Sequence, residues 1–186
     1  NNLRGLFRDA DMIMVDGSLT EQALRTAARL ANKYDVPLCA DPSSARLAHK
    51  LRPYLSHLHL LVPNEVEEAR LLDVDFVGYS PDTSLALARR LVSMGVRHVA
   101  ITLSDFGLNY ATSSETGYIP TSYSNQVDST GTGDAVTAAI MFGMLNELPA
   151  LECMRLGAAA ASLTLQSTET VVPDLSLDML YDHLIV

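Results

Sequence analysis

"MIMVDGSLTEQALRTAARLANKYDVPLCAD" (residues 12–41) places one amphipathic segment between two short apolar ones. The apolar segments, 12–15 and 36–40, have the length of strands, whereas 21–34 repeats apolar residues at helical spacing. The apolar positions of this predicted helix are Ala23, Leu24, Ala27, Ala28 and Leu30. A strand, a helix and a second strand in this order predict two parallel strands joined by a helical crossover.

The same alternation continues along the chain. Further strands are predicted at 58–62 and 98–103, and further helices at 44–51, 65–72 and 81–95. This rhythm predicts an α/β fold with a mostly parallel sheet and helices on both faces. Two antiparallel strands then follow at 107–113 and 116–122, and three helices at about 133–146, 150–166 and 176–186. Because no repeat or linker interrupts the pattern, we expect a single domain over residues 1–186.

The composition is that of a globular protein, with 48% apolar and 19% charged residues. A net charge of −9 without a basic cluster argues against nucleic acid and favours a small-molecule partner. No apolar run approaches the ~20 residues that span a membrane. Cys39 and Cys153 both lie in apolar surroundings and are predicted to be free thiols, which favours the cytoplasm. Exposed sheet edges are compatible with a homodimer.

Polar residues recur just past the predicted strands. Asp16, Asp41, Asn64, Thr102 and Ser104 each follow the carboxyl end of a strand or lie close to it. In open α/β sheets this edge is where ligands bind.

The loop "VDSTGTGD" (127–134) precedes the apolar segment "AVTAAIMFGML" and allows two interpretations. It could simply start a helix, since Asp, Ser and Thr are good N-caps. Alternatively, Gly131 and Gly133 let backbone amides converge on an anion at the positive end of the helix. In that case Asp134 would repel the anion unless it takes a proton from a nucleophile. The residues alone leave both interpretations open.

This loop resembles the C-terminal signature of the PfkB (ribokinase-like) carbohydrate and nucleoside kinases, whose usual form is Asp-Thr-Thr-Gly-Ala-Gly-Asp-Ala. Four other segments resemble family motifs in the same order: "DPSSARLAHKL" (41–51), "LVPNEVEEARLL" (61–72), "AITLSDFGLNYA" (100–111) and "AAAASLTLQSTETVVPDLS" (158–176). The resemblance covers essentially the whole chain and implies a three-layer α/β/α fold. It also implies that residues 1–186 are the C-terminal portion of such a kinase domain, with the family's N-terminal part and lid missing.

For the loop, the resemblance implies a catalytic role. Asp134 would be the general base, and the amides of Gly131, Thr132 and Gly133 would bind the transferring phosphoryl group. Asp128 would lie at a monovalent-cation position that in many members takes K⁺.

For the nucleotide, the resemblance implies ATP with Mg²⁺. Asn64 and Glu67 would hold the magnesium–phosphate network through waters, and Thr130 and residues 102–107, including Thr102, Ser104 and Gly107, would lie along the phosphates. Two residues depart from the pattern: Ser104 replaces a glycine, and Ser129 replaces a threonine. On the residues alone, Glu65, Glu67 and Glu68 could instead be only the acidic first turn of a helix.

Residues 15–72 and the tail 168–180 are most similar to the pseudouridine kinase branch, which implies ATP-dependent phosphorylation of the 5′-hydroxyl of pseudouridine. Two alternatives stay open: a kinase of another nucleoside or a sugar, and a non-catalytic nucleotide-binding module. A dinucleotide-binding dehydrogenase is disfavoured, because residues 12–24 contain one glycine, Gly17, where that fold needs a cluster.

Overall fold

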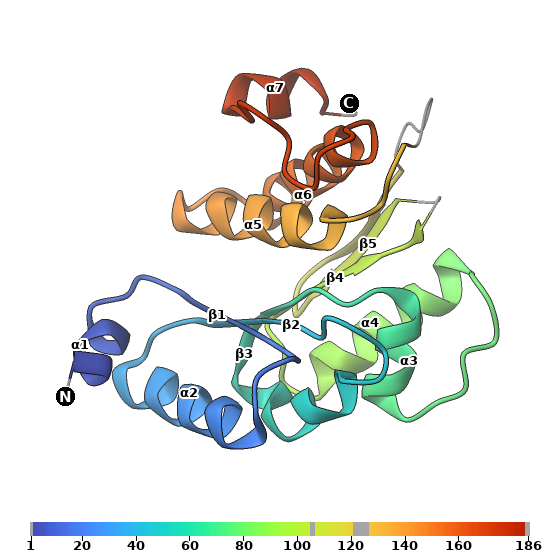
Figure 1. Ribbon diagram of the computed structural model, residues 1–186. Helices are drawn as coiled ribbons and strands as arrows, with labels where there is room; N and C mark the ends of the chain where they lie inside the picture. The colour runs from blue at the N-terminus through green and yellow to red at the C-terminus, as the bar shows by residue number, and fades with distance from the viewer. Residues whose placement is uncertain (1, 105–106, 121–126, 185–186) are drawn as a thin grey trace. The chain divides into compact units, whose positions relative to one another are not determined.

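The computed structural model describes residues 2–104, 107–120 and 127–184 (Figure 1). The chain forms two compact units. The first unit comprises Asn1–Ile101 and Tyr110–Thr116, and the second comprises Thr102–Asn109 and Gly117–Val186. Compact units also occur within single domains, so the single domain expected over 1–186 stays a prediction.

The sheet has six strands in the order β1-β2-β3-β4-β5-β6. They are β1 (Ile13–Asp16), β2 (Leu38–Asp41), β3 (Leu58–Leu61), β4 (His98–Thr102), β5 (Leu108–Thr112) and β6 (Thr116–Ile119). Strands β1 to β4 pair in parallel, as predicted. The connections to β5 and β6 are too short for a parallel crossover, so these strands run antiparallel to their neighbours. The predicted mostly parallel sheet is therefore confirmed; residues 121–122 of the last predicted strand lie outside the described residues.

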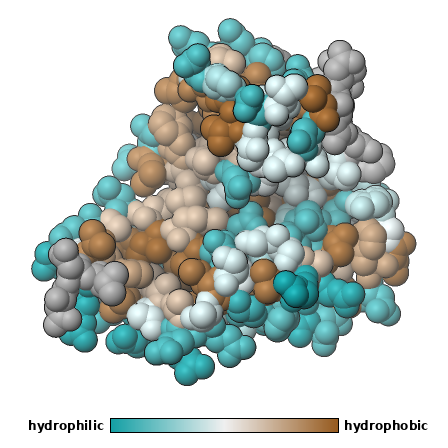
Figure 2. Space-filling view, in the orientation of Figure 1, coloured by the Kyte–Doolittle hydropathy of each residue, from teal (hydrophilic) through white to brown (hydrophobic). Residues whose placement is uncertain are grey.

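The helices of the first unit are α1 (Asn2–Arg8), α2 (Glu21–Tyr34), the 3-10 helix η1 (Ala48–His57), α3 (Glu65–Leu72) and α4 (Pro81–Ser93). Strands β1 to β4 follow one another across the sheet, and right-handed crossovers then place the connecting helices on one face. Figure 1 shows α2, α3 and α4 on this face. The outward side of α2 is polar, as Figure 2 shows at the lower left.

The caps of these helices explain where they begin. The side chain of Thr20 accepts a hydrogen bond from the amide of Ala23 at the start of α2. Buried apolar residues then line one side of α2: Leu24, Ala27, Ala28, Leu30 and Ala31. The predicted helix at 44–51 is wrong in type and extent, because the structure has the 3-10 helix η1 at 48–57, which contains Pro53. Proline lacks an amide hydrogen and is poorly tolerated inside an α-helix.

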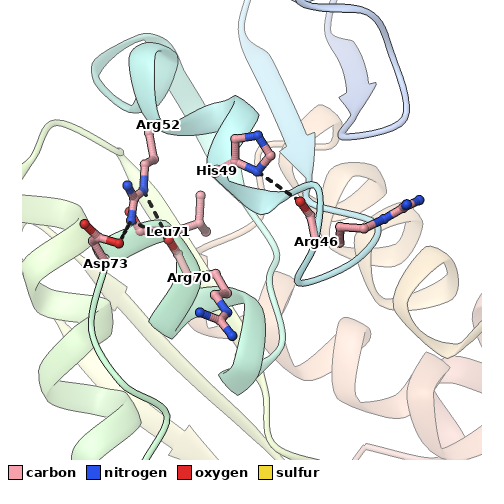
Figure 3. A network of polar contacts seen from close by, with 6 residues as sticks. All are labelled: Arg46, His49, Arg52, Arg70, Leu71 and Asp73. Atoms are coloured by element: carbon pink, nitrogen blue, oxygen red, sulfur yellow. Dashed lines mark hydrogen bonds and ion pairs between the residues drawn. The ribbon is translucent and has the colours of Figure 1, made fainter.

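A side chain of η1 covers the end of α3 (Figure 3). The Arg52 guanidinium donates to the carbonyl oxygens of Arg70 at 2.7 Å and Leu71 at 2.9 Å, and forms an ion pair with Asp73 at 2.9 Å. Nearby, His49 Nδ1 lies 2.9 Å from the carbonyl oxygen of Arg46. Arg52 therefore gives the carbonyls at the end of α3 a charged donor, in addition to the amide of Asp73, which lies 3.4 Å from the Arg70 oxygen.

The second unit contains α5 (Thr132–Leu145), α6 (Ala150–Leu165) and α7 (Leu177–Asp182). Helices α5 and α6 approach closely at two glycines. A Cβ on Gly143 would lie 2.9 Å from Cys153 Sγ, and one on Gly157 would lie 2.8 Å from Ile140 Cγ1. The core cluster of this unit is Ala139, Leu156, Ala159, Ala160, Leu163 and Leu180.

Both cysteines, Cys39 and Cys153, are buried free thiols, as predicted. Within the described part of the chain, every helix is too short or too polar to span a bilayer.

Candidate active site

The carboxyl ends of β1 and β2 present two neighbouring carboxylates in the first unit. Asp16 and Asp41 lie opposite each other in the parallel register. Each side chain turns back to accept a hydrogen bond of 2.6 Å from a backbone amide two residues later, Ser18 for Asp16 and Ser43 for Asp41. Hydrogen bonds from Ser18 hold the pKa of Asp16 below its usual range. This edge is negatively charged and suits a cation better than a bare anion.

Lys50 of η1 forms two hydrogen bonds with the loop after β1. Its ammonium group donates to the carbonyl oxygen of Gly17 at 2.6 Å and to that of Leu19. Gly17 itself packs against the next loop, because a Cβ there would lie 2.2 Å from the carbonyl oxygen of Pro42. Sequence reasoning missed Lys50, since its partners lie more than 30 residues away in the chain.

Asn64 and Glu67 form a reciprocal cap at the start of α3. Asn64 Oδ1 accepts from the Glu67 amide, and Glu67 Oε2 accepts from the Asn64 amide, both at 2.9 Å. Glu67 is nonetheless only 5% exposed. Burial, with a smaller contribution from the charge of Asp41, raises the pKa of Glu67 to about 7. Glu67 thus lies in an acidic first helical turn and also caps it, while a buried carboxylate beside a second acidic group is also a natural place for a cation.

The other two glutamates of this turn are buried as well. Glu65 is 5% exposed and Glu68 is fully buried. Ser84 Oγ of α4 donates to Glu68 Oε2 at 2.9 Å. Burial raises the pKa of Glu65, and that of Glu68 to about 8. Glu65 and Glu68 are thus buried against α4 and its cap, which their local sequence does not reveal.

In the second unit, the glycine loop leads directly into α5. Gly131 is the N-cap residue, with φ +83°, and no side chain caps this helix. The first-turn amides of α5 therefore have no capping side chain of the kind that Asp, Ser or Thr would give, although the amide of Thr132 donates to the carbonyl oxygen of Ser129 at 3.2 Å. The structure thus contradicts a plain side-chain cap and leaves a helix N-terminus suited to an anion.

Asp128 shapes the same loop. Its Oδ1 accepts from both the backbone amide of Thr130 at 2.9 Å and the Thr130 hydroxyl at 2.8 Å. These bonds hold the pKa of Asp128 below its usual range. The loop therefore carries an ionised carboxylate at the predicted cation position.

An apolar cavity of about 490 Å³ lies beside this loop within the second unit. Ala135, Ala138 and Phe142 of α5 line one side, and Val172 and Leu177 of the tail line another. Gly131 and Asp134 also border the cavity. A volume of this size accommodates a small-molecule ligand.

After β4, the described residues on either side of 105–106 lie close together. Leu103 N donates to Gly107 O at 2.8 Å, and a Cβ on Gly107 would lie 2.1 Å from Ile119 O. Ser104 has φ +45°, in the left-handed region that favours glycine. The positive φ of Ser104 therefore explains why a glycine suits this position. Residues 105–106 lie outside the described residues.

Predicted site residues thus occur in both units: Asn64 and Glu67 in the first, and residues 102–107, 128 and 130–134 in the second. Among the described residues, no group of three or more His, Cys, Asp or Glu side chains is arranged to hold a metal ion.

A mostly parallel sheet and a helix that begins without a side-chain cap after a glycine loop define an α/β protein. Residues 2–176 match the family described as pfkB family carbohydrate kinase, and the chain belongs to this family. The fold is accordingly the ribokinase-like α/β fold.

Among curated proteins, the chain is 29% identical over 169 residues to pseudouridine kinase of Escherichia coli (strain K12), covering 90% of this chain and 53% of that protein. Among solved structures, it is similar to a carbohydrate kinase from Agrobacterium tumefaciens (TM-score 0.82, 25% identity), covering 99% of this chain and 57% of the other. It also shares the fold of an Arabidopsis thaliana ribokinase complexed with ribose and ATP (TM-score 0.79, 23% identity), covering 97% of this chain and 59% of that one. The chain spans about half the length of the curated relatives it matches.

Proposed function

We propose that the protein transfers a phosphoryl group from ATP to a hydroxyl of a ribosyl compound, and that the acceptor is the 5′-hydroxyl of pseudouridine. One observation carries the proposal. The N-terminus of α5 has no side-chain cap, and the carboxylate of its first turn, Asp134, borders an apolar cavity beside it. An anion site with a carboxylate beside it fits phosphoryl transfer from a donor to an attacking hydroxyl.

In this mechanism the amides of Gly131, Thr132 and Gly133 bind the charge that develops on the transferring phosphoryl group. Asp134 accepts the proton of the attacking hydroxyl. Its exposed side chain is free to approach an acceptor. The nucleotide base would occupy the apolar cavity, and Thr130 would contact the phosphates.

The residues of the first unit fit Mg²⁺. Glu67 offers a buried carboxylate next to the charge of Asp41, and Mg²⁺ commonly binds through one or two carboxylates, waters and substrate phosphates. When bound, Mg²⁺ neutralises charge on the phosphates. Asn64 and Glu67 would orient this network, while Thr102, Ser104 and Gly107 would lie along the nucleotide. The ionised Asp128 fits K⁺ as the monovalent cation near the loop.

Pseudouridine is supported by the likeness to pseudouridine kinase, which extends over 90% of the chain. A kinase of another nucleoside or of a sugar is the second candidate, supported by the fold shared with the ribokinase complexed with ribose and ATP. With either function, the protein would be a cytoplasmic enzyme with a small-molecule substrate. It would act on neither nucleic acid nor membrane, and both functions are compatible with a homodimer.

Mass spectrometry tests the proposal, using the longest reading frame that contains this chain, with ATP, Mg²⁺ and K⁺. The acceptors are pseudouridine, uridine, adenosine, inosine and ribose. We expect phosphorylated pseudouridine, and Asp134→Asn should lower the rate by roughly 10²–10⁴-fold. The matched control is Asp82→Asn, an exposed carboxylate in the first turn of α4.

Each other outcome points to a different conclusion. Product with another acceptor would keep the kinase and reject pseudouridine. Binding of Mg²⁺–ATP without transfer to any acceptor would favour the non-catalytic module. A near wild-type rate for Asp134→Asn would reject Asp134 as the base.

A further inference from the structure

Glu65 and Glu68 form a buried acidic pair on the side of α3 that faces α4. The two residues are three apart and therefore lie on the same face of the helix. They are 5% and 0% exposed. Neither belongs to the proposed phosphoryl-transfer machinery, so the pair needs its own explanation.

The hydrogen bonds of this pair are incomplete. The backbone of Ser80 donates to the Glu65 carboxylate, and Ser84 Oγ donates to Glu68 Oε2. The remaining oxygens, Glu65 Oε2 and Glu68 Oε1, are buried without a hydrogen-bond partner among the described residues. Buried polar atoms are nearly always satisfied, so two orphaned acceptors on one helix face indicate a ligand-binding site.

Both carboxylates line one small cavity. Ser80, Thr83 and Ser84 of α4 and its cap contribute to its wall, together with Asp75 of the preceding loop. Its volume is about 20 Å³, which is enough for a single water-sized species. The orphaned oxygens and the cavity therefore describe a site for one small ligand.

The acidic side chains of the site favour a positively charged ligand. In the described part of the chain, the ion pairs of acidic side chains involve Asp9, Asp73 and Glu152, and none involves Glu65 or Glu68. The N-terminus of α4 supplies only a partial positive charge of about one half. Burial raises the pKa of both carboxyl groups, so they can be ionised together only when more positive charge than this is supplied, because an unpaired buried charge is strongly unfavourable.

We propose that Glu65 and Glu68 bind one divalent cation between α3 and α4, with Ca²⁺ as the preferred ion. Carboxylate and hydroxyl oxygens are the ligands that hard cations take, and Ca²⁺ gives up its water more readily than Mg²⁺ does. The cation fixes α3 against α4 independently of nucleotide. With two carboxylates, the expected Kd is roughly 10⁻⁴–10⁻³ M, the weak end for calcium sites.

The test uses the 186-residue chain in chelator-treated buffer without nucleotide. Isothermal titration with CaCl₂ and with MgCl₂ measures binding, and thermal unfolding at about 10 mM of each salt, well above the expected Kd, measures stabilisation. We expect one saturable Ca²⁺ site and a rise in Tm of roughly 3–11 °C, because 10 mM Ca²⁺ at this Kd adds about 1.4–2.7 kcal/mol to the free energy of unfolding. Glu65→Gln/Glu68→Gln should weaken Ca²⁺ binding at least tenfold, and the single variant Glu65→Gln, which keeps the Ser84 bond, should weaken it as well.

Glu67→Gln and Glu115→Gln are the controls, the first in the proposed magnesium network and the second exposed in a hairpin turn. Both should bind Ca²⁺ as the wild type does. Saturable binding that Glu67→Gln abolishes, or that Glu65→Gln/Glu68→Gln leaves unchanged, would overturn the assignment, as would the lack of any saturable binding to the wild type. None of these results depends on turnover, so the site and the proposed kinase activity can fail separately.

Discussion

The carbonyl oxygen of Thr170 lies against Gly131, where any other residue would carry its side chain. A Cβ on Gly131 would be 2.1 Å from this oxygen. The backbone of Gly131 also has φ +83°, which side-chain-bearing residues rarely adopt. The C-terminal tail therefore packs directly on the loop that precedes α5.

Gly131→Ala should destabilise the protein, because it adds both a steric clash with Thr170 and an unfavourable φ. We expect a loss of about 2–4 kcal/mol in the free energy of unfolding, measured by urea denaturation. Gly78→Ala is the matched control, since Gly78 also has a positive φ, +114°, but a Cβ added there would have no other atom within 4 Å. Equal losses in both variants would mean that the contact with Thr170 contributes nothing.

Glu67→Gln separates the capping role of Glu67 from its proposed magnesium role. Glutamine can still accept the hydrogen bond from the Asn64 amide, and it removes a buried charge. We therefore expect stability at pH 8 equal to or above that of the wild type, by about 0–1 kcal/mol, but a loss of Mg²⁺-dependent ATP binding of at least tenfold.

Urea denaturation and titration with Mg²⁺–ATP measure these two effects. Asn64→Ala is the comparison, because it should lower stability by about 1 kcal/mol through loss of the cap. Unchanged ATP binding in Glu67→Gln would leave Glu67 with a structural role alone.

The change in the free energy of unfolding with pH should reflect the titration of the buried Glu68 carboxyl group. Burial raises its folded-state pKa to about 8, above the ordinary value of 4.5 that applies to the unfolded chain. As pH rises, the unfolded chain loses this proton at a lower pH than the folded chain does. The contribution of Glu68 to the free energy of unfolding is therefore complete below about pH 4.5 and is lost progressively up to about pH 8.

Glu68→Gln should flatten this decline in the free energy of unfolding, which for one proton is at most roughly 1.4 kcal/mol for each pH unit between the two pKa values. Urea denaturation from about pH 5 to pH 8 with a chelator present measures it, and Glu115→Gln should leave the slope unchanged. A wild-type slope that survives in Glu68→Gln would assign the decline to other groups, with Glu67 and Glu65 the first to examine.

Local signals predicted those parts of the fold whose causes lie within a few residues. Helices α2 and α3 begin where predicted, because Thr20 and Asn64 are strong caps that can be read from the sequence. Gly131 could likewise be assigned to a tight turn from the sequence, because glycine itself is the local signal for such a turn. The sequence also placed polar groups at the strand ends, since strands are recognised by their short apolar runs.

The remaining features depend on contacts between distant segments. The burial of Glu68 depends on Ser84 of another helix, and the position of Lys50 depends on carbonyls in the loop after β1. Helix α1 was not predicted, because it has only seven residues, too few for a distinctive pattern, and contains Gly5. The 3-10 helix η1 extends through Pro53, where local propensity argues against a helix, and its Arg52 contacts the end of α3.

Arg52→Met should destabilise the first unit, because it leaves the carbonyls of Arg70 and Leu71 without their charged donor while keeping much of the apolar stem (Figure 3). The expected loss is about 1–3 kcal/mol, most of it from the carbonyl bonds, because the ion-pair partner Asp73 is 87% exposed. Urea denaturation in low salt and in about 0.5 M salt separates the two contributions: the loss should change little with salt. Arg25→Met, on the exposed side of α2, is the control and should be neutral within about 0.5 kcal/mol. If Asp73→Asn alone reproduced the full loss, the ion pair rather than the cap would hold the end of α3.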